Sequence, residues 1–95
     1  MIDLKKYARG KECQIRLEKC MGEHEGNCIC HWRDSSTGCG KKENDLIAAH
    51  GCFYCHGVVD GRIPIPKGMT WREVREAHKD GIIRTLQLLS REGII

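Results

Sequence analysis

The chain has few aromatic side chains and no long apolar run. Its 95 residues include one Phe, two Trp and two Tyr, so little aromatic surface is available for a core. A chain of this length fits a single domain and buries only about 60–65% of the surface that its unfolded form exposes. Domains with so small a core commonly depend on disulfides or on a bound metal ion. The sequence therefore predicts that apolar packing alone does not hold this fold together.

The sequence also lacks an apolar stretch of the kind needed for export or membrane insertion. It begins Met1-Ile2-Asp3-Leu4-Lys5-Lys6, without the apolar core of a secretory signal, and no segment approaches the length of a membrane span. We therefore expect a cytoplasmic protein without a membrane partner. Thiols stay reduced in that compartment, where clustered cysteines more often bind metal than form disulfides. The seven cysteines also cannot all pair within one chain.

Two cysteine pairs have the character of a metal staple. Cys52 and Cys55 have the spacing of a zinc knuckle, in which a tight turn presents two thiolates to one ion. Cys13 and Cys20 form a second pair with a longer loop, and loop length adds little closure entropy. We expect these four thiolates to hold a structural Zn²⁺, with no coordination position left for a substrate.

The other three cysteines leave the ligand set open. Cys28, Cys30 or Cys39 could replace Cys13 or Cys20, and some of the thiols could be buried without metal. Residues 27–32 alternate as a short strand does. We expect Cys28 and Cys30 to face opposite sides of that strand, which would make them poor partners for one ion.

The remaining pattern predicts helices. A short helix is expected from about residue 55 to residue 60. Thr70 and Glu73 match a capping box at the start of a longer helix. Gly81 is a candidate break in that helix, and Gly93 fits its end.

Histidines next to these elements are candidates for chemistry. His56 follows the knuckle, and Asp60 lies four residues on, along the same helix face. Such a pair can hold a divalent ion or simply face solvent. His31 ends the predicted strand, where it is either a general base or a structural histidine. Asp45 can orient that imidazole, bind metal or cap its loop.

The charge distribution is compatible with a nucleic-acid partner. The net charge of +3 is small, but basic residues crowd the first twenty positions. Arg33, Lys41 and Lys42 lie in and near the predicted loop and are candidates for phosphate contacts. The same residues could form an ordinary solvated surface.

Taken together, these motifs resemble the YbcO family of small prophage proteins classed as nucleases, within the broad HNH or His-Me finger group. The likeness covers most of residues 3–62 and is weaker beyond them. The residues that carry it are Arg9-Gly10-Lys11-Glu12-Cys13-Gln14, His31-Trp32-Arg33, Gly38-Cys39-Gly40, Asp45-Leu46-Ile47-Ala48 and Cys52-Phe53-Tyr54-Cys55-His56 with Asp60.

The resemblance implies an α+β fold in one domain, residues 1–95. A basic arm or short helix at 1–11 would precede a zinc-stapled ββα-metal core at 12–62, in which a β-hairpin carries the first His and a helix the last. A helical region at 70–92 would follow. The fold class expected is thus a small HNH-like unit with an additional C-terminal helix.

The resemblance also implies roles for individual side chains. His31 would be the general base, with Asp45 in the place usually taken by Asn. His56 would be a ligand of a catalytic Mg²⁺ or Mn²⁺, with Asp60 as a further candidate. Cys30 departs from the family pattern, because typical HNH sites have a His or Asp ligand before the general base.

The function expected is that of a metal-dependent endonuclease acting on nucleic acid, with DNA as the expected substrate and a recombination protein as a candidate partner. The alternative is a zinc-bound DNA-binding or adaptor module without catalysis. Cys52-x-x-Cys55-His56 also matches the c-type haem signature, with Met69 as the second axial ligand. That interpretation is disfavoured because haem attachment of this type requires an exported chain.

Overall fold

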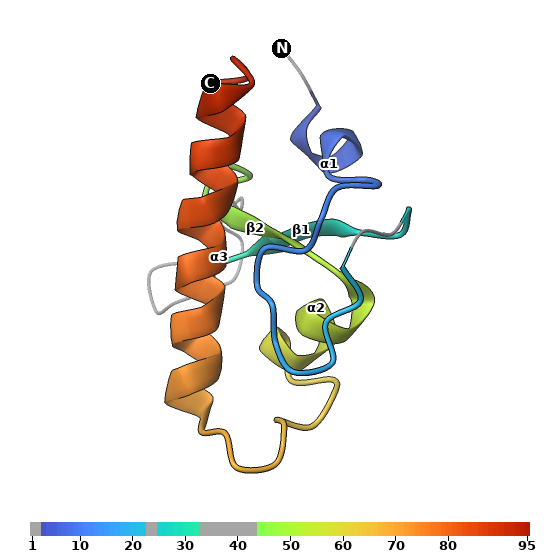
Figure 1. Cartoon of the computed structure of the whole chain (residues 1–95), viewed down its shortest axis with the longest axis vertical. Helices are drawn as coiled ribbons and strands as arrows, with labels where there is room; N and C mark the ends of the chain where they lie inside the picture. The colour runs from blue at the N-terminus through green and yellow to red at the C-terminus, as the bar shows by residue number, and fades with distance from the viewer. Residues whose placement is uncertain (1–2, 23–24, 33–43) are drawn as a thin grey trace.

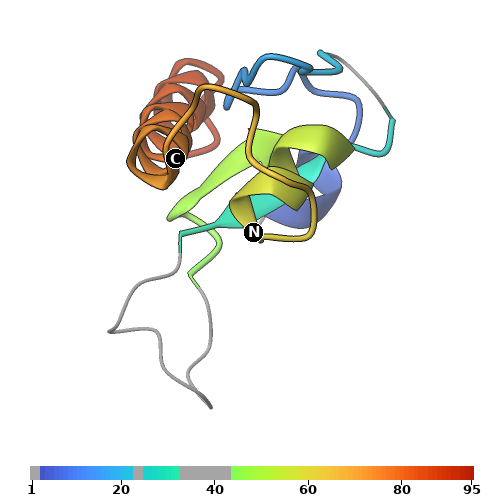
Figure 2. The ribbon, with the colours of Figure 1, turned by 90° about the horizontal axis from the view of Figure 1, so that it is seen from below.

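The computed structural model describes residues 3–22, 25–32 and 44–95. The elements found there are, in chain order, α1 (Leu4–Tyr7), β1 (Cys28–His31), β2 (Ala48–Gly51), α2 (Phe53–Val59) and α3 (Trp71–Arg91). The two strands cross the middle of the molecule, with α3 on one side and α1 and α2 on the other (Figures 1 and 2). The α+β class expected from the sequence is therefore confirmed. No helix within the described ranges combines the length and apolar character needed to cross a bilayer.

The two strands form an antiparallel hairpin. Cys28 lies opposite Gly51, and His31 lies opposite Ala48. The predicted strand at 27–32 is confirmed by β1. Strand β2, which ends just before Cys52, is buried along its whole length. The hairpin is followed directly by α2, so two strands and a helix are consecutive in the chain.

Helix α2 begins earlier than the sequence predicted. Cys52 is its N-cap, and the Sγ atom of Cys52 accepts the backbone N–H of Cys55. The start predicted near Cys55 is thus two residues late, because a thiol is an uncommon N-cap and gave no signal. Gly57 lies inside the helix without breaking it. A Cβ atom there would overlap the Ile63 side chain, which packs on the helix.

Helix α3 is continuous over 21 residues. The capping box is confirmed, since the Glu73 N–H donates to Thr70 Oγ1 and the Thr70 N–H donates to Glu73 Oε1. The predicted break at Gly81 is wrong. The glycine instead allows close approach, because a Cβ atom at Gly81 would lie 3.0 Å from the carbonyl oxygen of Gln14. Gly93, at φ 73°, follows the end of the helix as expected.

The core lies between α3, the hairpin and the segment 12–17 that precedes β1. We call this segment the strap. The strap is held by backbone bonds, with the Gln14 N–H donating to the His50 carbonyl at 2.8 Å. Arg84 of α3 donates to the Gln14 carbonyl at 2.6 Å. The main hydrophobic cluster consists of aliphatic side chains and thiols: Cys13, Ile15, Leu17, Cys30, Ala49, Cys52, Cys55, Val58, Val74 and Ile82. The imidazoles of His50 and His78 are also buried. As the composition predicted, aromatic rings contribute little.

Thr85 joins α3 to the hairpin, and we expect its hydroxyl to matter for stability. Thr85 Oγ1 accepts the buried His50 N–H at 3.0 Å and donates to the Gly81 carbonyl at 2.8 Å. Thr85→Val keeps the shape but leaves the His50 N–H without its acceptor, at a cost of about 1–3 kcal/mol. Urea unfolding of the metal-loaded protein measures this loss.

Thr85→Ser is the matched control for that substitution. It keeps the hydroxyl and removes one buried methyl group, at a cost of about 1 kcal/mol. A valine variant at least as stable as the serine variant would contradict this account of Thr85.

Candidate metal centre and catalytic residues

Four sulfur atoms predicted from the sequence to bind one ion lie together in the structure. The Sγ atoms of Cys13, Cys20, Cys52 and Cys55 all lie within 4.8 Å of one another. Cys13 comes from the strap, whereas Cys52 and Cys55 are the N-cap and first turn of α2. All of these thiols except the half-buried Cys20 are fully buried. The fold therefore brings the two pairs into one compact cluster.

Backbone N–H groups and neighbouring thiols surround the sulfurs of the four-cysteine cluster. Cys52 Sγ accepts the backbone N–H groups of Met21 and Cys55, each at 3.4 Å. The Cys55 thiol, assisted by nearby backbone N–H groups, lowers the pKa of Cys13 to about 4. Burial raises the pKa of Cys20, and the hydrogen bond to Cys13 raises the pKa of Cys55. The thiolate is the form that binds metal. Four sulfurs at this spacing with N–H donors around them fit a structural metal ion such as zinc.

His31 lies beside a carboxylate. It ends β1, and the hairpin register places the turn before β2 next to it, so that Asp45 Oδ1 lies 2.7 Å from His31 Nε2. A carboxylate only accepts hydrogen bonds, so Nε2 carries the proton that is donated to Asp45. The structure therefore brings His31 and Asp45 together in the arrangement that orients a general base.

His56 contacts one partner on each side of its ring. Asp60, one helical turn on in α2, lies 3.0 Å from His56 Nε2. Cys28 Sγ of β1 lies 3.1 Å from His56 Nδ1. The Cys28 thiol raises the pKa of His56, and the Cys30 thiol together with His56 lowers the pKa of Cys28 to about 4. The i, i+4 pair was predicted, but the contact with Cys28 was not.

The expectation that Cys28 and Cys30 face opposite sides of the strand is wrong. Strand side chains alternate with a period of two, so residues 28 and 30 share a face. In the structure the Cys30 thiol hydrogen-bonds Cys28. Cys30 also covers Gly51, the residue opposite Cys28, where a Cβ atom would overlap its sulfur. The two-residue period of a strand therefore predicts, from the sequence alone, that Cys28 and Cys30 lie on one face of β1.

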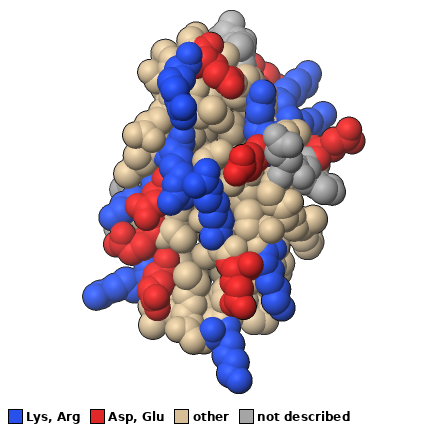
Figure 3. Space-filling model, in the orientation of Figure 1, with Lys and Arg blue, Asp and Glu red and all other residues tan. Residues whose placement is uncertain are grey.

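A surface hollow of about 470 Å³ lies beside the two histidines and Cys28. His31, His56 and Cys28 line it, and the basic side chains of Lys5 and Arg9 lie at the same hollow. By contrast, acidic and basic side chains are interspersed over the face of the molecule shown in Figure 3. Of the basic residues predicted near the site, Arg33, Lys41 and Lys42 lie outside the described residues.

Arg75 of α3 is a candidate that the sequence did not reveal. With His31 and Asp60 it lines a smaller hollow of about 230 Å³. Its guanidinium group lies 3.8 Å from the centre of the Trp32 ring. Residues 32 and 75 are far apart in sequence, and no motif connects them. The position of Arg75 thus places a guanidinium group at a hollow that His31 also lines.

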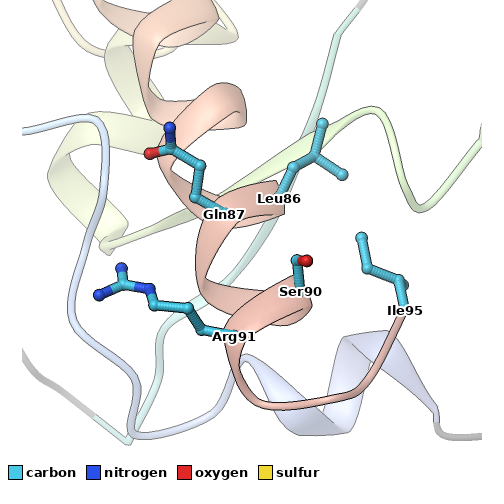
Figure 4. A pocket seen from close by; sticks show the side chains of 5 residues that line it. All are labelled: Leu86, Gln87, Ser90, Arg91 and Ile95. Carbon is cyan, nitrogen blue, oxygen red and sulfur yellow. The ribbon is translucent and has the colours of Figure 1, made fainter.

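A separate hollow of about 810 Å³ lies at the end of α3. Leu86 and Ile95 point to one side of the helix there, while Gln87 and Arg91 lie on the other (Figure 4). The described lining residues carry no thiol, imidazole or side-chain carboxylate. This hollow therefore offers no group for acid–base or metal chemistry.

Comparisons with known proteins agree on one family. A family model described as "Putative nuclease YbcO" matches residues 2–94. "Putative nuclease YbcO" of Escherichia coli (strain K12) is 37% identical over 98 residues, which cover 100% of this chain and 98% of that protein. A protein of the same description from Enterobacteria phage 82 has the same identity and coverage. A solved structure described as "Structure of a putative bacteriophage protein from Escherichia coli str. K-12 substr. MG1655" matches with a TM-score of 0.77 and 33% identity over 96% of this chain and 100% of that chain.

Proposed function

Since this chain belongs to the YbcO family of nucleases, we propose that it is a metal-dependent endonuclease that hydrolyses the phosphodiester bonds of DNA. The observation that carries the proposal is the shared hollow, in which a carboxylate-bound His31 and the helix residue His56 lie with basic side chains. The order β1, β2, α2 is compatible with a ββα-metal unit of the HNH type. A cytoplasmic location and a recombination protein as partner belong to the same proposal.

The structural zinc is assigned to Cys13, Cys20, Cys52 and Cys55. These four sulfurs would supply all the ligands of a tetrahedral ion, so the ion would hold the strap to α2 and take no part in the reaction. The burial of Cys52 and Cys55 with two further sulfurs also argues against haem attachment at these residues.

The proposed reaction begins at His31. Its Nδ1 atom takes a proton from water, which then attacks phosphorus. Asp45 holds the ring at Nε2 and stabilises the imidazolium that forms. Lys5 and Arg9 at the hollow would hold the nucleic-acid backbone, and this affinity should fall steeply with salt.

His56 is the proposed ligand of a catalytic divalent ion, which when bound would stabilise charge on the phosphate and on the leaving oxygen. Asp60, predicted as a second ligand, contacts His56 Nε2. This contact favours a positioning role for Asp60, because a carboxylate behind a metal-binding imidazole fixes its tautomer and orientation.

The test is a cleavage assay on supercoiled plasmid, linear DNA, single-stranded DNA and RNA, with Mg²⁺, Mn²⁺ or Zn²⁺ added to protein that keeps its structural zinc. We expect ion-dependent cleavage that falls by about 100-fold or more in His56→Ala. Lys79→Ala is the control, since it removes a basic charge from an exposed ion pair with Glu76. Retention of DNA without cleavage under any ion would favour the non-catalytic DNA-binding alternative.

A further inference from the structure

The Cys28 thiol lies where a ligand to the proposed catalytic ion would be needed. We infer that Cys28 of β1 and His56 of α2 bind the same ion, and that this ion is a thiophilic one such as Zn²⁺ rather than Mg²⁺. The inference rests on the proposed function for the choice of His56. It adds a thiolate ligand that the sequence resemblance did not supply.

The hydrogen bonds of His56 determine which ring nitrogen is available. Asp60 Oδ2 lies 3.0 Å from Nε2, and a carboxylate accepts only, so Nε2 carries the proton. Nδ1, on the other side of the ring, lies 3.1 Å from Cys28 Sγ, so an ion bound at Nδ1 would lie next to this sulfur. Metal-binding histidines commonly donate their second N–H to a carboxylate. The His56 ring fits this pattern, with the Asp60 carboxylate at one nitrogen and the Cys28 thiol at the other.

The position of the pair suits an open site. Both Cys28 and His56 line the hollow that also contains His31, so water and a phosphate oxygen have access. Within the described ranges, the four-cysteine cluster is the one group of three or more ligands within 4.8 Å of one another. An ion at Cys28 and His56 would thus have two protein ligands, with its other positions left for solvent and substrate. Closed coordination marks structural zinc, and open positions mark catalytic zinc.

The chemistry of the ligands determines the kind of ion. Mg²⁺ takes oxygen ligands and dehydrates reluctantly, whereas thiolate and imidazole suit zinc and its neighbours in the transition series. A second thiol, that of Cys30, hydrogen-bonds Cys28 and makes the surroundings softer still. Cys30, the residue that departs from the usual HNH pattern, thus lies on the same face of β1 as Cys28. The expected catalytic ion is therefore not the Mg²⁺ or Mn²⁺ of the sequence resemblance.

The experiment measures binding without reference to cleavage. Protein carrying one equivalent of zinc is titrated with Co²⁺, and the thiolate-to-cobalt charge-transfer band is followed while the zinc content is checked. We expect the wild type to take up one Co²⁺ with a charge-transfer band and to keep its zinc. Cys28→Ser should lose the band and bind Co²⁺ at least about tenfold more weakly.

Asp60→Asn is the second variant. It keeps both proposed ligands, so the band should remain while affinity falls about 10- to 100-fold, as for other partners behind a ligand. The inference is overturned if zinc-loaded wild type binds no Co²⁺, or if Cys28→Ser retains the full band. A protein that passes this test but cuts no nucleic acid would refute the proposed function and leave the Cys28 site standing.

Discussion

Removal of the ion from the four-cysteine cluster is expected to unfold the protein. The four sulfurs are part of the main core, beside a small set of aliphatic side chains. Structural zinc contributes about 10–16 kcal/mol in small domains, which is as large as the whole stability of a typical domain, about 5–15 kcal/mol. A strong chelator should therefore abolish the helical circular dichroism signal as zinc is lost.

A pair of cysteine variants separates this role from simple loss of a thiol. Cys52→Ser removes a ligand and the N-cap of α2 and should be unfolded or lose zinc. Cys28 lies outside the cluster, so the Cys28→Ser variant should keep one zinc and the native circular dichroism spectrum. A metal-free protein with an unchanged cooperative thermal transition would show that the cluster is not what stabilises the fold.

Replacement of His31 by alanine is expected to reduce cleavage by about 10³-fold or more, with zinc content and thermal stability unchanged. General-base catalysis contributes about 10²–10⁴-fold, and the oriented imidazole is the group proposed to take the proton from water. His31 lies at the end of β1, where its side chain retains some exposure and faces the hollow. Its removal should not open a core cavity. Initial cleavage rates at saturating ion concentration measure the effect.

Asp45→Asn provides the matched control for His31. An amide is nearly the same size, but it cannot stabilise the imidazolium as a carboxylate does, so an intermediate loss is expected while DNA binding is kept. Undiminished cleavage by His31→Ala would remove this histidine from the mechanism. Equal loss of DNA binding and cleavage would instead assign it to substrate binding.

Local patterns in the sequence were sufficient for much of the framework. The capping box at Thr70, the alternating strand that ends at His31 and the knuckle at Cys52 each depend on residues close together in the chain. Short-range hydrogen bonds and side-chain periodicity determine such features, and the structure has them near the predicted positions. The convergence of the two cysteine pairs was also expected, because a metal site requires four ligands.

Contacts between distant residues could not be predicted in the same way. No residue near Gly81 in the sequence indicates that this glycine meets the strap at Gln14. A glycine within a helical pattern predicts a break, whereas Gly81 permits close packing. The position of Arg75 near Trp32 depends equally on how α3 packs. The Cys28–His56 contact depends on which face of β1 meets α2, and that packing is not encoded in residues close together in the chain. The basic residues of the loop remain predictions.

The close approach of α3 to the strap has a consequence for the exchange of an ion bound by the four-cysteine cluster. Gly81 and Arg84 hold the backbone at Gln14, next to the ligand Cys13. The position of Cys13 in the four-cysteine cluster therefore depends on α3, a helix that begins after Cys55 in the chain. Detachment of that helix would free the strap and open the cluster, so the rate of metal exchange is tied to a motion of the C-terminal third of the molecule.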